Sequence, residues 1–252
     1  MVSRSRKPWF LGAIVPAVIL LFWEVFVDIG VLNPFFVSSP VRIVLAAHDQ
    51  LATAEFYRHF LASIVSYATG FGLAAVLGIF LALLIVRFKY IEYSLEPLLW
   101  FCYSAPLIAL FPLFMIFLGP GYPTVITLTG LLGMIPITIN TVTGFKNADR
   151  GLIRVARSFG AGPRDIFWKI LLPNSLPFTV AGLRIGAGRA LIGLVIGEML
   201  ASSLGLGARI SYYGNKIRTS DLFVEVMVVL LLGLTVTQGL RFVERKLERH
   251  RD

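Results

Sequence analysis

Two long stretches of this chain contain no charged residue, and they restrict its fold more than any other feature. The first runs from Phe60 to Val86 and the second from Pro97 to Phe145. Because a helix needs about 20 apolar residues to cross a bilayer, the first stretch suits one span and the second suits two. The segment Gly119–Pro123 divides the second stretch, since glycine and proline interrupt helices. We therefore predict a polytopic membrane protein.

The composition agrees with this prediction. Hydrophobic residues make up 57% of the chain and the mean hydropathy is +0.81, whereas soluble domains are about 45–50% apolar. We predict an all-α fold that forms a single domain, residues 1–252. The six expected spans lie near residues 10–30, 60–86, 97–118, 124–145, 178–201 and 222–240.

The basic residues predict the orientation of these spans. One side of the membrane receives most of the Lys and Arg, namely those of the N-terminus, Arg87, Lys89, the cluster Lys146–Lys169 and the tail Arg241–Arg251. The other side receives Arg42, Arg58, Arg209, Lys216 and Arg218. Positively charged loops face the cytoplasm, so both termini and the loop 146–177 are expected there. The net charge of +9 then reports topology and does not indicate a nucleic-acid partner. The external loop 31–59 is expected to contain an amphipathic helix from Ser39 to His59.

Small residues recur every four positions in two of the predicted spans. They form one stripe on the second span and another on the fifth. Such stripes let helix backbones approach closely in lipid, so we predict compact helix packing along them, with a partner subunit as a further candidate. The two stripes consist of Ala62, Ser66, Gly70, Ala74, Gly78 and Ala82, and of Gly182, Gly186, Ala190, Gly193, Gly197 and Ala201.

The stretch VARSFGAGPRDIFWKILLPNSLP, residues 155–177, is basic and rich in glycine and proline, although it lies between predicted spans. Residues 150–159 place apolar side chains at helical spacing with arginines on the opposite side. Gly160 suits the left-handed conformation that ends a helix, and Pro163 suits the first position of a new one. We predict two short helices around a glycine elbow.

Two functions fit this elbow from its residues alone. It is either a loop helix that lies on the bilayer surface, with arginines on lipid phosphates, or a docking element for a cytoplasmic partner. Pro173 and Pro177 are expected to stop its second helix before the fifth span, because proline disrupts a helix interior.

The same stretch resembles a cytoplasmic pattern of ABC importer permeases: Glu-Ala-Ala, three residues, Gly, nine residues, Ile, one residue, Leu-Pro. Here Arg154-Val155-Ala156 is followed after three residues by Gly160, and Ile170 and Leu172-Pro173 stand at the required distances. The chain departs from the pattern at its opening Glu, here Arg154, and at its first Ala, here Val155. The segments LFPLFMIFLGPG and GLRIGAGRALIGLVIGEMLASSLGLG look like the branch that serves nitrate, sulfonates, taurine and related small molecules.

The resemblance implies a type I ABC importer permease in a bacterial inner membrane, which moves a small polar or anionic solute. It also implies two ATP-binding subunits, a second permease copy that makes a homodimer, and an external solute-binding protein. In such a transporter the elbow is a coupling helix that docks on the ATPase. The residues expected to dock are Ala156, Arg157, Ser158, Phe159, Gly160 and Ala161.

Glu198, Arg189 and Arg184 lie within the fifth predicted span, where charged groups are costly and need a partner or water. Glu198 has either a structural hydrogen-bonding role or a role in the pathway or gate. Arg189 is a candidate for attracting an anion, with a structural pair as the alternative. Arg184 is expected to extend to the cytoplasmic surface, and at about 21 Å along the helix it is too far from Glu198 to pair with it.

Other functional classes find less support in the sequence. The chain has no Gly-x4-Gly-Lys-Ser/Thr loop, so we do not expect it to be an enzyme that hydrolyses ATP, and we expect no cofactor. His48, His59 and His250 lack metal-ligand spacing and are expected to be solvated, and the lone Cys102 excludes an internal disulfide. The alternative function is an ion-coupled secondary transporter or channel, although Glu198 is almost the only carboxylate deep in a span.

Overall fold

The computed structural model describes residues 9–33 and 36–248 and, for side chains, residues 14–33 and 36–246. Every regular element in these ranges is a helix, as predicted. The predictions for Arg4, Arg6, Lys7, Arg249, His250 and Arg251 fall outside the described residues.

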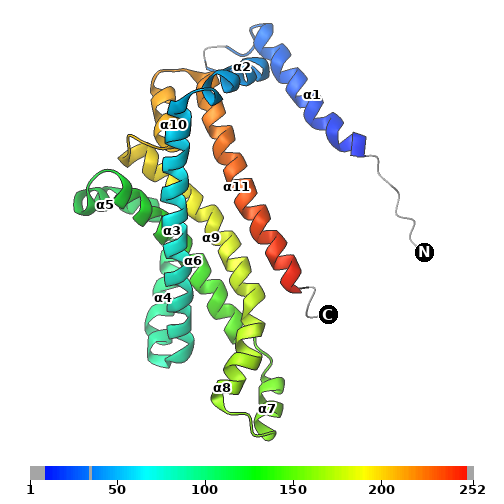
Figure 1. Cartoon of the computed structure of the whole chain (residues 1–252), viewed down its shortest axis with the longest axis vertical. Coiled ribbons are helices and arrows are strands. Elements are labelled where there is room, and N and C mark those ends of the chain that lie inside the picture. Colours follow the sequence, from blue (N-terminus) through cyan, green and yellow to red (C-terminus); the bar gives the residue numbers. More distant parts are fainter. Residues whose placement is uncertain (1–8, 34–35, 249–252) are drawn as a thin grey trace.

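Long helices run side by side along the molecule, and shorter ones lie at its two ends (Figure 1). The elements in chain order are α1 (Trp9–Asp28), α2 (Pro40–Leu51), α3 (Ala54–Arg87), α4 (Lys89–Ser104), η1 (Leu107–Leu110), α5 (Phe111–Leu118), α6 (Tyr122–Lys146), α7 (Arg150–Ser158), α8 (Pro163–Ile166), η2 (Phe167–Leu171), α9 (Leu172–Ala201), α10 (Leu206–Asn215) and α11 (Thr219–Glu248).

Four helical runs are long and apolar enough to cross a membrane: Ala54–Arg87, Tyr122–Lys146, Pro163–Ala201 and Thr219–Lys246. A fifth candidate is the pair Lys89–Ser104 and Leu107–Leu118, which is bent by 94° at a short break. The segment predicted as a span over 97–118 is thus sharply bent, and it counts as one candidate span only if the bent pair is taken together. Pro106 explains the break, because the residue before a proline avoids the helical conformation, and Ala105 is extended (φ −72°, ψ 145°).

The expected amphipathic helix over 39–59 is in fact two helices. Ser39 accepts a hydrogen bond from the backbone of Arg42 and starts α2, which ends at Leu51. Thr53 then accepts one from the backbone of Phe56 and starts α3. A threonine in this capping position begins a new helix, so His59 already belongs to the long span.

Pro173 and Pro177 do not stop the helix that follows the elbow, contrary to expectation. α8, η2 and α9 form one helical run from Pro163 to Ala201. Pro173 stands in the first turn of α9, and the five residues of η2 before it form a π-helix. A π-helix is wider than an α-helix and commonly forms where the regular backbone hydrogen bonds of a helix are interrupted. The wider turn relieves the clash between a proline ring and the preceding turn. The second helix of the elbow therefore continues into the fifth predicted span without a stop.

α6 is the central helix of the bundle, because α3 and α9 both pack along it. Both predicted stripes of small residues are buried in these contacts, which confirms the compact packing. At Gly186 a β-carbon would lie 2.7 Å from the carbonyl oxygen of Gly133 and 2.7 Å from Ile137 Cγ1. Only a residue without a side chain permits α6 and α9 to approach this closely.

Candidate functional site

The elbow projects from the end of the molecule opposite α2 and α10 (Figure 1). Asp149 caps α7 by accepting a hydrogen bond from the backbone of Gly151 at 2.6 Å. Gly160 has φ +81°, the left-handed conformation that was expected to end the helix. The backbone of Ala161 then donates to the carbonyl of Ala156 at 3.0 Å. This pattern is typical of a glycine-terminated helix, so the bend is fixed by the backbone.

The six residues predicted to dock on an ATPase lie together at the tip of this elbow. The side chain of Phe159 is the most conspicuous of them, since 87% of its surface is exposed. The hydroxyl of Ser158 instead donates back to the carbonyl of Val155 at 2.8 Å. The ring is therefore available for contact with a partner, as the docking prediction requires.

At the opposite end of α9, Glu198 is fully buried and connects three helices. Its carboxylate accepts hydrogen bonds from the Ser63 hydroxyl of α3 at 2.8 Å and from the backbone of Gly207 at 2.9 Å. The Ser63 oxygen in turn accepts from the backbone of Leu206 at 2.8 Å. The carboxylate thereby satisfies the free N–H groups at the start of α10, where a negative charge is favourable. This geometry favours the structural role that was weighed for Glu198.

Because Glu198 serves as a hydrogen-bond acceptor, the shape of its side chain should matter more than its charge. We expect Glu198→Gln to retain at least about half of the transport activity, since the amide oxygen still accepts from Ser63 or Gly207. Glu198→Leu should lose most of the folded protein, because it leaves buried donors unsatisfied at about 1–3 kcal/mol each. Monodisperse protein yield and uptake measure both effects. Loss of uptake by well-folded Glu198→Gln would instead assign the charge to the pathway.

Arg189 lies about 14 Å from Glu198 along α9, so the structure does not bring these two predicted residues together. Its guanidinium group stacks over the ring of Tyr103 at 4.1 Å, and its Nη1 is 3.5 Å from the Tyr103 carbonyl oxygen. No described carboxylate pairs with it. Tyr103 precedes the break between α4 and η1, so this half-buried cation sits beside a broken helix.

Arg184 does not simply extend to the surface. Its Nε lies 3.0 Å from a carboxylate oxygen of Glu244 on α11. Lys146 makes a similar link nearby, at 2.7 Å from both Glu92 and Glu96 of α4. These ion pairs join neighbouring helices at the elbow end of the molecule.

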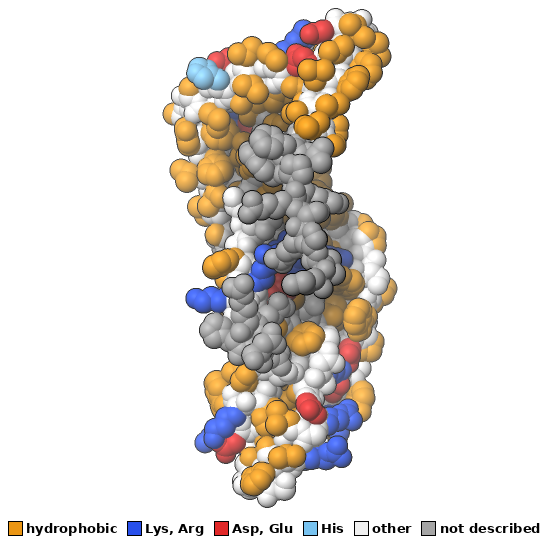
Figure 2. Space-filling view, turned by 90° about the vertical axis from the view of Figure 1, so that its right-hand side faces the viewer, with side chains coloured by type: hydrophobic (Ala, Val, Ile, Leu, Met, Phe, Trp, Pro, Cys, Tyr) orange, Lys and Arg blue, Asp and Glu red, His pale blue; other side chains and the backbone are white. Residues whose placement is uncertain are grey.

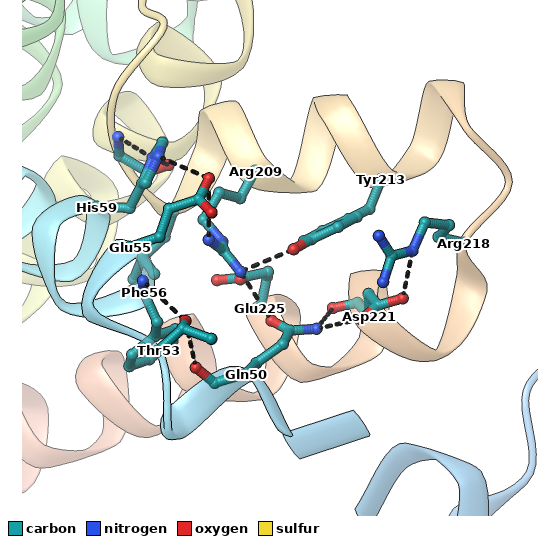
Figure 3. A network of polar contacts seen from close by, with 12 residues as sticks. Gln50, Thr53, Glu55, Phe56, His59, Arg209, Tyr213, Arg218, Asp221 and Glu225 are labelled. Atoms are coloured by element: carbon teal, nitrogen blue, oxygen red, sulfur yellow. Dashed lines mark hydrogen bonds and ion pairs between the residues drawn. The ribbon is translucent and has the colours of Figure 1, made fainter. Parts of the chain in front are cut away.

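The sequence reasoning missed a polar network at the α2 end (Figure 3). Arg209 of α10 is 5% exposed and forms an ion pair with Glu225 of α11, which is fully buried. Its Nη2 also donates to Gln50 Oε1 at 3.1 Å and to the Tyr213 hydroxyl at 2.8 Å. Gln50 donates in turn to Asp221 at 2.7 Å. The signal was present, because Arg209 and Glu225 are single charges of opposite sign within apolar segments.

This network lines the floor of an open hollow of about 470 Å3. Burial raises the pKa of the Tyr213 phenol, which favours its neutral, protonated form. Glu55 lies 3.9 Å from Arg209 Nη1 but is exposed. The network joins α2, α10 and α11 into one cap over the bundle.

His48 is exposed, as expected, but His59 is not solvated. The ring of His59 is 13% exposed, and the backbone of Gly205 donates to its Nδ1 at 3.1 Å. Within the described ranges no three His, Cys, Asp or Glu side chains are grouped to hold a metal ion.

Comparisons with known proteins place these features in context. Residues 74–249 match the family model described as "Binding-protein-dependent transport system inner membrane component". The chain is 32% identical over 250 residues to an aliphatic sulfonates transport permease of Bacillus subtilis, which covers 99% of this chain and 91% of that protein. It is 26% identical to the taurine transport system permease of Escherichia coli, over 92% of this chain and 86% of that one.

A third relative is the nitrate import permease of Synechocystis, which is 27% identical over 92% of this chain and 86% of that protein. Among solved structures, a chain of the MetNI methionine ABC transporter in an inward-facing conformation superposes with a TM-score of 0.58. The match covers 82% of this chain and 97% of that one at 19% identity, so it shows a shared fold.

Proposed function

The chain belongs to the family of inner membrane components of binding-protein-dependent transport systems, the permeases of ABC importers, and from this membership we propose how it works. It forms the membrane pathway of an importer for a small anionic solute, in a bacterial inner membrane, as one domain. Two ATP-binding subunits drive it, a second copy completes the pathway, and an external binding protein delivers the solute. The observation that carries this proposal is the rigid, projecting elbow at Gly160.

The distribution of basic side chains supports a cytoplasmic elbow. Arg87, Lys89 and the cluster Lys146–Lys169 lie at the elbow end, and Figure 2 shows Lys and Arg side chains gathered at this lower end. Fewer basic residues lie at the α2 end, and Arg209 there is neutralised by Glu225. By the positive-inside rule the elbow faces the cytoplasm, and α1 adds the sixth span.

The elbow transmits the movement of the ATPase because it continues directly into a span. ATP binding closes the two ATPase subunits, and the docked Phe159 and Gly160 move with them. The unbroken helix from Pro163 to Ala201 then shifts against α6 and changes the side to which the pathway opens. The ATPase must bind the two states with different affinity, since otherwise it drives no change.

Arg189 is the proposed contact for the solute. It combines a positive charge without a described carboxylate partner, a half-buried position in a span, and proximity to the break at Pro106. Broken helices near the midplane form the solute sites of several transporters. The sulfonate, taurine and nitrate named for the relatives all carry a negatively charged group that this guanidinium can attract.

We expect Arg189→Ala to reduce uptake of the anionic solute about 10- to 100-fold, because a hydrogen bond to a charged group contributes about 1.5–3 kcal/mol. Arg189→Lys keeps the charge and should retain most uptake. Arg58→Ala removes an exposed cation near the start of α3 and serves as the control. Uptake of the labelled solute into proteoliposomes measures all three, and equal rates for wild type and Arg189→Ala would exclude this contact.

The function itself is tested by copurification. The tagged chain should retain an ATP-binding subunit, and ATP hydrolysis by that complex should rise when the binding protein and its ligand are added. Mass spectrometry of the ligand that copurifies with the binding protein identifies the solute. A chain that carries solute uphill without any ATPase would be the ion-coupled transporter of the alternative hypothesis.

A further inference from the structure

A hollow of about 1080 Å3 lies between the end of α3 and the elbow. Three arginines from three different elements line it: Arg87 ends α3, Arg157 lies in the last turn of α7, and Arg164 lies in α8. No acidic side chain is among the described residues that line the hollow. The three arginines therefore make it strongly electropositive.

The acidic groups at this end of the molecule are engaged elsewhere. Asp165 pairs with Lys169 at 2.7 Å, and Glu92 and Glu96 both pair with Lys146. Within the described chain none of the three arginines has an ion-pair partner, and Arg87 lies only against the ring of Phe88. All three are exposed, so their charges are open to an anion from outside the chain.

The remaining lining is apolar, and part of it belongs to a helix that is long and apolar enough to span a membrane. Leu83 and Val86 belong to the last turns of the charge-free stretch of α3, which ends at Arg87. Trp168 and Leu171 form the opposite wall, and 64% of the Trp168 surface is exposed. Tryptophan is enriched where a membrane meets water. The hollow thus has a positively charged rim and an apolar wall. This combination suits the level of the lipid headgroups.

We infer that this hollow binds an anionic phospholipid. Its phosphate group sits among Arg87, Arg157 and Arg164, and its acyl chains lie along Leu83 and Trp168. Basic pockets between membrane helices on the cytoplasmic side are suited to such headgroups. Since no ion pair or hydrogen bond between described residues joins α3 to α7 or α8, the lipid bridges the elbow to the bundle. This goes beyond the proposed function, because lipid binding does not depend on a partner protein.

A lipid fits these walls better than the surface of a protein partner does. Of the predicted docking residues, Arg157, Gly160 and Ala161 also line the hollow, whereas the exposed Phe159 at the projecting tip does not. The apolar wall at Leu83 and Val86 lies instead beside the charge-free part of α3, where the bilayer reaches the chain. Occupation of the hollow by an ATPase subunit remains a distinguishable outcome of the experiment.

Trp168 provides a direct probe, because the chain has four tryptophans and the others can be replaced. The full-length variant Trp9→Phe/Trp23→Phe/Trp100→Phe is placed in nanodiscs that contain brominated phosphatidylglycerol or brominated phosphatidylcholine, and quenching of Trp168 is measured. We expect the phosphatidylglycerol to bind with at least about tenfold preference, since each basic residue near an anionic surface adds roughly fivefold. Equal quenching by the two lipids would overturn the inference.

Two matched sets of substitutions distinguish binding at this site from general electrostatic attraction between the protein and an anionic lipid. Arg87→Gln/Arg157→Gln/Arg164→Gln should remove the preference for phosphatidylglycerol. Arg150→Gln/Arg154→Gln/Arg241→Gln removes the same net charge from exposed residues that do not line the hollow, and should retain the preference. An equal loss in both sets refutes the site. If the preference for phosphatidylglycerol disappears when the ATP-binding subunit is added, that protein occupies the hollow. This result also refutes lipid binding there.

Discussion

Gly160→Trp should leave the chain folded in the membrane while reducing ATP-driven uptake to near background. The residue lies at the elbow with φ +81°, and nothing lies within 4 Å of the position of a β-carbon, so a larger side chain points into open space. Its effect should therefore fall on the proposed contact with the ATPase and on the shape of the turn. We expect ATP hydrolysis by the complex to lose its response to binding protein and solute.

Gly30 supplies a matched control for this substitution. It has φ +77°, and it too has nothing within 4 Å of the β-carbon position. It lies near the α2 end, far from the elbow (Figure 1). Gly30→Trp therefore imposes the same backbone strain of about 1–2 kcal/mol without touching an ATPase. If both variants lose uptake to the same extent, or if Gly160→Trp transports normally, the elbow does not couple the two proteins.

The second large effect is expected at the α2 end, where Arg209→Ala should lower the free energy of unfolding by about 3–5 kcal/mol. The substitution leaves Glu225 fully buried without its cation, and Glu225 Oε2 already has no hydrogen-bond partner in the described chain. It also removes the donor that Gln50 and Tyr213 share. Thermal unfolding of the purified protein in detergent measures the loss.

Arg218→Ala is the control for this prediction. Arg218 pairs with Asp221 at 2.8 Å, but its side chain is 55% exposed, so the pair contributes about 0–1 kcal/mol. The double variant Arg209→Met/Glu225→Leu should recover much of the stability, because it removes both buried charges together. If the thermal unfolding midpoint of Arg209→Ala is as high as that of Arg218→Ala, the buried ion pair does not stabilise the protein.

The sequence allowed much of this fold to be predicted, because the strongest signals are local. Charge-free stretches mark the spans, small residues mark the packed faces of α3 and α9, and the Gly160–Pro173 spacing marks the elbow. Proline was the misleading signal: Pro106 breaks a predicted span, whereas Pro173 stands in the first turn of a helix preceded by a π turn. Whether a proline bends, starts or ends a helix depends on its neighbours in the fold.

The partners of the buried charges were harder to predict. Ser63 and Glu198 are far apart in the chain, and a serine within an apolar span carries no sign that it holds a carboxylate. Arg209 and Glu225 are each visible in the sequence as a charge within an apolar segment. Only the fold shows that Arg209 of α10 forms an ion pair with Glu225 of α11. Single charges in apolar segments indicate that a partner exists, and the three-dimensional arrangement decides which one.

The continuous helix from Pro163 to Ala201 has a mechanical consequence. Its 39 residues correspond to a rod of about 58 Å, with the elbow at one tip and the carboxylate of Glu198 near the other. We expect a run of this length, which includes the π-helical turn at residues 167–171, to transmit a tilt at the elbow to its far end. We expect the hydrogen bond between Glu198 and the backbone of Gly207 to make α10 move with that end.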